Sequence, residues 1–506
     1  MQPIVYCRST SPDENVSFAS RWRQAPAARL IGVPYSHLLR ILSASCVLIL
    51  SGCVKYYSRP LNPPLLENQY RSRTLSEDAL RSFVQANAGE AISSWPPKVL
   101  DLRTLTLIGY FYSPDLEIAR SQITISEAGI RAAGARINPS LGFDGGYNTN
   151  PESALLYSVL PSFTIETAGK RGLRILQAKR QAEAARVALA EAAWSLRSRI
   201  RSAFYDHLLS ARRQDLLETE QSIRSEIVDI FDKRLAVGEA ARPELDVYRV
   251  DLITTQAALR AAVGDVAQTR AALASVIGLP LAVVEGLTIE SSTLDSPLPE
   301  ERLPIQGVQR AGLLHRADIR RTLVDYSAAE AALRLEIARQ YPDLQLSPGY
   351  IFEEGFARYL LSGSLQSLPV FHRNQGLIAV AEAQRRQTGE RFEALQAQAI
   401  GQMERAVVLY RAALTEWREA NDRLRTAQRD REEAARRALA AGEGDRLSLA
   451  TVRLQSVTAG RARLDALTRV QTALRALEDA MQQPLEAAVL DVPEPLIVSP
   501  RRGASR

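Results

Sequence analysis

The sequence is poor in the residues from which most catalytic and metal-binding sites are built. Its 506 residues include 3 cysteines, 3 methionines and 4 histidines. The histidines His37, His207, His315 and His372 are far apart in sequence. No CxxC, HExxH, phosphate-loop or GxSxG motif is present. With three scattered methionines there is also no ladder for a soft metal such as Cu(I). The sequence therefore predicts a protein that is not an enzyme and has neither a cofactor nor a metal site, and His372 is predicted to be a solvated or hydrogen-bonded side chain.

Proline and glycine are nearly missing from two long stretches, and aromatic residues make up only 6% of the chain. Residues 172–236 contain no proline, and residues 376–441 are interrupted only by Gly389 and Gly401. Each stretch predicts a helix of about 65 residues, or roughly 100 Å. Compact globular domains do not use helices of that length. The pattern is typical of a coiled coil or a helical tunnel.

The net charge of +6 is small for a chain of this length. Residues 1–52 carry five arginines and two acids, a net +3, so the remaining chain also carries only +3. Arginine and glutamate alternate through stretches such as 411–437, as on a solvated helix face. This distribution argues against nucleic-acid binding.

The N-terminal region predicts a targeting segment. A polar, basic stretch precedes an apolar run over residues 38–50, which is too short to span a bilayer. The run ends in Leu-Ser-Gly-Cys, which resembles the lipobox cleaved by lipoprotein signal peptidase. Residues 1–52 are accordingly predicted as a lipoprotein signal peptide, with Cys53 lipidated and Val54 favouring the outer membrane. The alternative is a buried cysteine near a first helix. Prolines between 60 and 97 indicate that residues 53–113 form an extended segment and a first short helix.

The rest of the chain is a duplication with a period of about 204 residues. Equivalent residues lie 203 or 204 positions apart in the same order: Pro139 and Pro342, Gly146 and Gly349, Gly172 and Gly376, Leu173 and Leu377, Gly238 and Gly442, Arg242 and Arg446, Leu245 and Leu449, Arg249 and Arg453. A fixed offset over a whole half predicts two copies of one unit. The predicted repeats are 114–279 and 307–484, joined by a linker at 280–306 and followed by a tail at 485–506.

Each repeat predicts a β-hairpin, at about 139–167 and 342–368, before its long helix. Apolar residues such as Tyr147, Phe163, Tyr350 and Leu361 alternate with small or polar ones, as in a membrane strand. A soluble hairpin with one wet face has the same pattern, and the predicted lipid anchor favours the membrane. Four strands cannot close a barrel, so other copies must pair the edges. Two chains give eight strands and three give twelve, and the pattern does not choose.

The order helix, hairpin, long helix, turn, helix, repeated twice over about 70–485, resembles the TolC-like outer-membrane factors. The turns at 234–239 and 438–443 resemble the tip motif of that family. The resemblance implies a mainly α fold with membrane β-hairpins. It also implies a homotrimer whose twelve-strand β-barrel, four strands per chain, lies in the outer membrane and continues into a long periplasmic α-helical coiled-coil tunnel. The implied partners are outer-membrane lipid, a periplasmic adaptor (membrane fusion) protein and an inner-membrane pump.

Two stretches resemble a narrower group, the cobalt–zinc–cadmium resistance branch of this family. They are residues 166–172 (ETAGKRG) and 368–376 (LPVFHRNQG), each following a hairpin. The likeness implies a passive conduit for heavy-metal cations and a pump of the resistance-nodulation-division type. Two alternatives stay open, an outer-membrane conduit for multidrug efflux or type I protein secretion, and a lipid-anchored coiled-coil scaffold without a pore. The alternating hairpins argue against the scaffold.

The two turns between long helices form the candidate site, because they lie at the helix ends opposite the hairpins. The predicted adaptor-docking rim and aperture comprises Gly238, Gly442, Arg234, Glu239, Arg242, Glu443 and Arg446. The glycines suit a tight left-handed turn, although a plain helix cap would also use them. The possible gate acids are Glu244, Asp246 and Asp445. Many family members carry more acids after the second turn, where this sequence has Asp445 alone, so the gate is left open.

Overall fold

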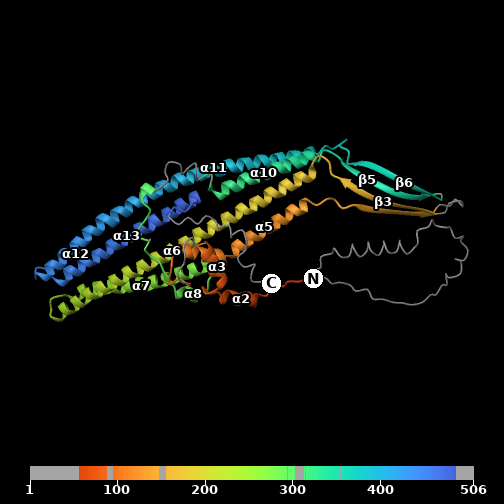
Figure 1. Ribbon diagram of the computed structural model, residues 1–506. Coiled ribbons are helices and arrows are strands. Elements are labelled where there is room, and N and C mark those ends of the chain that lie inside the picture. The colour runs from red at the N-terminus through yellow and green to blue at the C-terminus, as the bar shows by residue number, and fades with distance from the viewer. Residues whose placement is uncertain are drawn as a thin grey trace, which may run out of the picture. The chain divides into compact units, whose positions relative to one another are not determined.

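The computed structural model describes residues 56–87, 95–147, 155–292, 294–302, 313, 315–353 and 355–485. Cys53, the predicted signal peptide and most of the predicted tail lie outside these residues. The chain divides into two compact units, Met1–Leu65 and Leu66–Arg506. The second unit holds nearly all of the described elements, and it is mainly helical with one four-stranded sheet (Figure 1).

The segment before the first repeat contains more helix than the sequence predicted. Three helices occur there, α2 (Pro63–Arg71), α3 (Asp78–Asn87) and α4 (Leu102–Tyr112). The prolines predicted an extended segment, but α2 begins at Pro63. Proline is tolerated in the first helical turn, because the N–H that it lacks has no intrahelical partner there. Asp101 begins α4 as an N-cap, accepting a hydrogen bond from the Thr104 N–H at 2.9 Å.

Both repeats show the same order of elements. The first comprises α5 (Pro114–Ala133), β2 (Ser140–Tyr147), β3 (Leu155–Ile165), α6 (Lys170–Ala236) and α7 (Arg242–Ile277). The second comprises α10 (Ala317–Ala338), β5 (Asp343–Glu353), β6 (Phe356–Gln366), α11 (Gln375–Arg418), α12 (Arg425–Ala440) and α13 (Arg446–Met481). At 67 residues, α6 is about 100 Å long.

The long helix of the second repeat is not uniform, unlike the prediction. Between α11 and α12 the backbone passes through a π-helical segment, Glu419–Leu424. The segment is held from α13, where Arg463 donates to the Asn421 side chain at 2.9 Å. Single π turns inside α-helices insert a residue without ending the helix. Residue patterns contain no strong signal for such an insertion.

Between the repeats, residues 280–306 contain short elements in place of a plain linker. These are α8 (Leu281–Glu285), β4 (Thr288–Ile289) and a 3₁₀ turn, Glu300–Arg302. The strand β4 pairs in parallel with β1 (Val99–Leu100). This pairing ties the inter-repeat segment to the region before the first repeat.

The two hairpins join into one antiparallel sheet with the order β2-β3-β5-β6. The central pairing aligns Phe163 with Leu346, and the next aligns Pro348 with Leu361. Because side chains alternate along a strand, this register gathers most of the apolar residues of the four strands on one face. Serine, glutamine and aspartate side chains share the other face with a few apolar ones, among them Leu156, Leu160, Ile351 and Leu360. The outer edges of β2 and β6 pair with no described strand of this chain.

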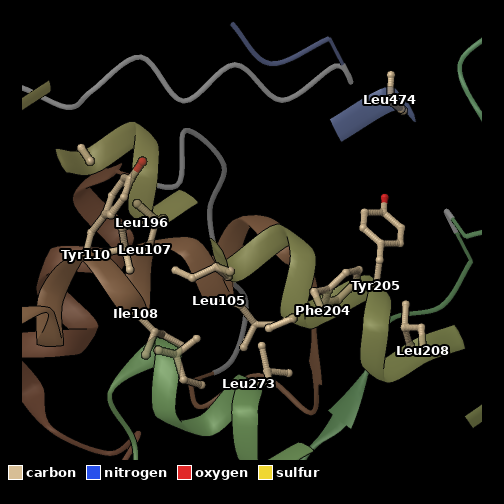
Figure 2. Close-up of a cluster of buried hydrophobic side chains, with 14 of the residues drawn as sticks. Leu105, Leu107, Ile108, Tyr110, Leu196, Phe204, Tyr205, Leu208, Leu273 and Leu474 are labelled. Carbon is tan, nitrogen blue, oxygen red and sulfur yellow. The ribbon is translucent and has the colours of Figure 1, made fainter. Parts of the chain in front are cut away.

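The main hydrophobic core lies where α4 packs against the long helices. Figure 2 shows Leu105 of α4 near Phe204 of α6 and Leu273 of α7, and Tyr110 of α4 beside Leu196 of α6. The approach is close, because a Cβ atom added at Gly109 of α4 would overlap the Ile200 side chain of α6. The core contains residues of α11 and α13 as well, so it joins both repeats.

None of the helices in the described part of the chain is both long and apolar enough to cross a membrane.

Candidate functional site at the helix turns

The first turn reverses the chain between α6 and α7 at Gly238. The backbone there is left-handed, with φ of +79°. The Gly238 N–H donates to the Leu235 carbonyl at 3.1 Å, and the Glu239 N–H donates to the Arg234 carbonyl at 2.8 Å. These bonds satisfy carbonyls that the helix end leaves without intrahelical partners. Glycine is suited to this position because it adopts a positive φ without the steric cost that a Cβ atom would add.

The second turn repeats this geometry between α12 and α13 at Gly442. Its φ is +76°, and its N–H donates to the Leu439 carbonyl at 3.2 Å. The Glu443 N–H bonds the Ala438 carbonyl at 2.9 Å, as Glu239 does in the first repeat. The predicted reversals at Gly238 and Gly442 are therefore both present, with matching hydrogen bonds.

The returning helices begin with different caps. In the first repeat, the Glu244 carboxylate accepts from the Ala241 N–H at 3.2 Å. In the second, the Asp445 carboxylate accepts from the Ser448 N–H at 2.7 Å. Each repeat thus keeps one half of a reciprocal capping box. Two of the three candidate gate acids are consequently engaged with their own helix N-termini.

Asp445 also connects the two repeats. Its Oδ2 lies 2.9 Å from Nη2 of Arg234, near the end of α6. Arg234 lies over the Phe231 ring as well, at 5.8 Å from its centroid. Hydrogen bonds from the Ser448 hydroxyl and N–H, together with Arg234, hold the pKa of Asp445 below its ordinary value. The aspartate is therefore ionised when it caps α13 and pairs with Arg234.

A small apolar cluster lies beneath this ion pair and holds α6, α7 and α13 together. Phe231 stacks on Tyr248 with ring centroids 4.3 Å apart. The buried members of the cluster are Ile223, Ile227, Val228, Phe231, Leu245, Ala450 and Val457. They come from both repeats, so the turns are packed as one end of a bundle and not as two separate hairpins.

The remaining predicted rim residues are exposed. Glu239 and Arg242 flank the first turn, and Glu443 and Arg446 flank the second. The third candidate gate acid, Asp246, is exposed and lies 3.8 Å from Arg249. The predicted residues therefore fall into two groups. Arg234, Glu244 and Asp445 form hydrogen bonds or ion pairs within the chain, and the four rim charges are exposed to solvent.

At the opposite helix end, polar contacts join the sheet to the helices. The Lys170 ammonium of α6 donates to Asp343 of β5 and to the Tyr341 carbonyl, both at 2.7 Å. The Thr167 hydroxyl donates to the Pro342 carbonyl at 2.6 Å. The first-repeat junction is thereby tied to the start of the second-repeat hairpin. Thr167 and Lys170 belong to the stretch of residues 166–172, which resembles the heavy-metal branch of the family.

The second junction uses Asn374, whose side chain donates to the Glu336 carbonyl at 2.8 Å. His372 accepts the Asn374 N–H through Nδ1 at 3.2 Å. Among the described residues, no group of three His, Cys, Asp or Glu side chains is placed to hold a metal ion.

The polar face of the sheet carries its own hydrogen bonds across strands. Ser158 of β3 donates to Asp144 of β2 at 2.8 Å. Gln345 of β5 donates to Ser162, and Gln366 of β6 donates to Gln345 at 2.6 Å. Hydrogen bonds between side chains therefore link each pair of neighbouring strands on this face of the sheet.

The comparisons with known proteins agree with this architecture. Residues 112–279 match the model of the family described as Outer membrane efflux protein. The fold matches VceC of Vibrio cholerae with a TM-score of 0.60 and 18% identity, over 76% of this chain and 97% of that one. It matches CusC with a TM-score of 0.62 and 18% identity, over 84% and 98%. It matches MtrE of Neisseria gonorrhoeae with a TM-score of 0.61 and 16% identity, over 87% and 100%. None of the curated proteins matches the sequence.

The chain has the fold of the TolC-like outer-membrane efflux proteins. The predicted resemblance to this family is confirmed. The description of the matched family as an efflux protein family agrees with the prediction that the chain is not an enzyme. The solved matches include structures titled as outer-membrane channels, CmeC of Campylobacter jejuni among them.

Sequence reasoning missed the pairing of Arg234 with Asp445, which lie 211 residues apart. A signal was present in the repeat itself. At the offset of 204, Arg234 corresponds to Ala438 and Asp445 to Ala241. Each charge therefore occurs in only one repeat, which is the pattern expected of a contact between repeats.

Proposed function

We propose that the chain is the outer-membrane channel of a tripartite efflux system and carries heavy-metal cations, such as cobalt, zinc or cadmium, passively out of the cell. In this proposal three copies assemble, their four-stranded sheets close a twelve-strand barrel, and their helices form a periplasmic coiled-coil tunnel. The proposed repeats are residues 114–279 and 307–484.

The observation that supports the channel most directly is the four-stranded sheet. One face is mainly apolar, the other carries most of the polar side chains, and the edges β2 and β6 pair with no described strand of the same chain. Strand edges in hydrocarbon must be paired, so copies of the sheet have to meet edge to edge. The strands β3, β5 and β6 have 11 residues each, the length of a tilted membrane strand.

The cargo assignment rests on the two junction stretches, residues 166–172 and 368–376. Their residues make structural contacts between the sheet and the helices, so they support a lineage more than a particular cargo. The pump that this lineage implies is of the resistance-nodulation-division type. Selection of the cation belongs to the pump, because a passive conduit needs no binding site of its own.

The exposed charges at the turns support adaptor docking there. Glu239 and Arg242 repeat as Glu443 and Arg446, so each chain offers the same pair of charges twice. A periplasmic adaptor that grips two equivalent turns per chain meets six equivalent sites on a trimer. The turns are also the part of the helices farthest from the sheet.

The anchor in this proposal is a lipid on Cys53, which holds the chain to the outer membrane together with the barrel. Mass spectrometry of the mature N-terminus tests it. A diacylated N-terminal Cys53 is the expected result, and an unmodified chain that begins upstream of residue 53 contradicts it.

Two measurements test the channel and its cargo. Purified protein in planar bilayers should show stepwise conductance, which a scaffold without a pore cannot give. Deletion of the gene should lower resistance to cobalt, zinc or cadmium, and the intact gene should restore it. Restored export of a secreted protein or of organic drugs, with metal resistance unchanged, would overturn the cargo while leaving the channel standing.

A further inference from the structure

A cavity of about 800 Å³ opens beside the end of the sheet that meets the helices. One wall is apolar and consists of Phe163 and Ile165 of β3, Leu346 and Pro348 of β5, and Leu361 of β6. The strand register places all five on the apolar face of the sheet. Phe163, Ile165 and Leu361 are exposed in the single chain.

The other wall carries two guanidinium groups. Arg136 precedes β2 and Arg171 lies in the first turn of α6. Arg171 donates through Nε to the Gly134 carbonyl at 2.7 Å, and neither arginine forms an ion pair with a carboxylate among the described residues. The one carboxylate in the lining, Glu166, is held by Arg174. The cavity is therefore positively charged where it is polar.

The second repeat has no unpaired cation at the two equivalent positions. The counterpart of Arg136 is Arg339, which is paired with Glu336, and the counterpart of Arg171 is the neutral Gln375. The second junction carries Arg373 instead, at the position of Gly169. The two junctions therefore share their backbone plan but place their positive charge differently.

The position of the cavity along the strands matches one border of a bilayer. Tyr157, Tyr350 and Tyr359 cluster toward the other end of the apolar face, with Tyr157 and Tyr350 6.0 Å apart. From Tyr157 to Ile165 the strand advances eight residues, about 26 Å along the strand and roughly 20 Å in height for a strand tilted by about 40°. The apolar band of a barrel is about 25 Å tall, with aromatic side chains at its borders. The arginine wall therefore lies near headgroup level on the helix side, and the apolar wall extends from there to Pro348 and Leu361, two residues from Tyr350 and Tyr359.

We propose that this cavity is a binding site for one anionic phospholipid of the inner leaflet. The inference rests on the proposed membrane channel. Arg136 and Arg171 bind the phosphodiester, for which the planar guanidinium is well suited. Phe163, Leu346 and Leu361 contact the first part of an acyl chain. The lipid fixes the depth of the barrel at its junction with the tunnel.

Native mass spectrometry of the full-length trimer tests the site with phosphatidylglycerol as the probe. One lipid per chain is expected. The variant Arg136→Gln/Arg171→Gln should bind about tenfold more weakly, as expected for the loss of charge-assisted hydrogen bonds. The matched control Arg386→Gln/Arg391→Gln removes two exposed charges from α11 and should bind as the wild type does. Glycerol 3-phosphate, which has the phosphate without acyl chains, should leave no adduct.

Equal phosphatidylglycerol binding by the two double variants overturns the site, as does glycerol phosphate that binds as well as the lipid. A second variant, Leu346→Trp, fills the apolar wall without changing charge and should also weaken binding. Conductance in planar bilayers is recorded on the same preparations. Normal conductance without selective lipid binding refutes the lipid site alone, whereas absent conductance in the wild type refutes the channel.

Discussion

Arg234 and Asp445 form an ion pair, with Nη2 and Oδ2 2.9 Å apart, between the last turn of one long helix and the N-cap of the returning helix in the other repeat. Their side chains are 35% and 49% exposed, so solvent screens the attraction. The pair contributes little to stability. Its effect is on geometry, since it fixes the distance between the two turns of one chain.

Removing this ion pair should loosen the end of the tunnel. Arg234→Gln and Asp445→Asn should each raise the open fraction of the channel in planar bilayers, and the double variant should do no more than either. Stability should change by less than about 1 kcal/mol, as for other exposed pairs. Asp445→Ala should cost about 1 kcal/mol more, because it also removes the cap on Ser448. Arg249→Gln, which breaks the Arg249–Asp232 pair between α6 and α7, is the control, and equal opening by it would contradict the assignment.

A bulky residue at the second turn should abolish transport without unfolding the protein. No atom lies within 4 Å of a Cβ placed at Gly442, so Gly442→Trp has room for its side chain. The backbone φ of +76° is what opposes it, at roughly 1–2 kcal/mol. Cross-linking to the adaptor and metal resistance are the measurements. Gly401→Trp adds the same bulk at an open helical position of α11 and should be tolerated. Adaptor cross-links confined to residues 280–306 would mean that the docking site is elsewhere.

Neighbouring residues of β3 should respond oppositely to a charge. Phe163 lies on the apolar face, whereas Ser162 lies on the polar face and accepts from Gln345. An arginine on the lipid side of a barrel costs about 2–4 kcal/mol at the midplane and less toward the borders, and Phe163 lies between the midplane and the helix-side border. Phe163→Arg should therefore weaken assembly in the outer membrane, and Ser162→Arg should mainly change conductance. Heat-resistant oligomer on gels and single-channel recordings distinguish the two, and equal tolerance would refute the assignment of faces.

Stability should fall in mild acid because of His207. The side chain is 4% exposed, and burial, aided by the charge of Arg270, holds its pKa below the ordinary 6.5. The folded state therefore favours the neutral ring, and stability is lost as pH falls through 6.5 toward the folded-state pKa. Melting temperatures measured between about pH 7.5 and 5 should show this loss. His207→Gln should flatten it, while His372→Gln, at an exposed position, should leave it unchanged.

Most of the repeated architecture could be predicted because its causes are local. Gly238 and Gly442 interrupt long runs, and alternation in residues 141–147 and 157–165 sets the strand faces through a period of two. The contact between Arg234 and Asp445 could not be predicted from the sequence, because it depends on how the ends of two helices from different repeats pack together. Residue spacing within one element contains no such information.

The errors have equally physical causes. The prolines at 63 and 64 contributed to the prediction of an extended segment, although they begin helix α2. The buried group formed by Arg197, Arg201 and Glu478 was also missed. The Arg201 and Glu478 side chains are each 1% exposed, and both arginines contact the same carboxylate. Arginine is mostly a surface residue, so residue type and spacing did not indicate that these two side chains are buried.

The unpaired edges of β2 and β6 also bear on the order of events during biogenesis. A lone chain that entered the bilayer would leave two rows of backbone N–H and C=O groups without partners, at several kcal/mol for each group. Association in water must therefore come before, or together with, insertion. In the proposed channel, insertion then requires several chains to associate. Its rate therefore rises more steeply than linearly with the concentration of chains that reach the membrane. A modest fall in synthesis would deplete the channel out of proportion.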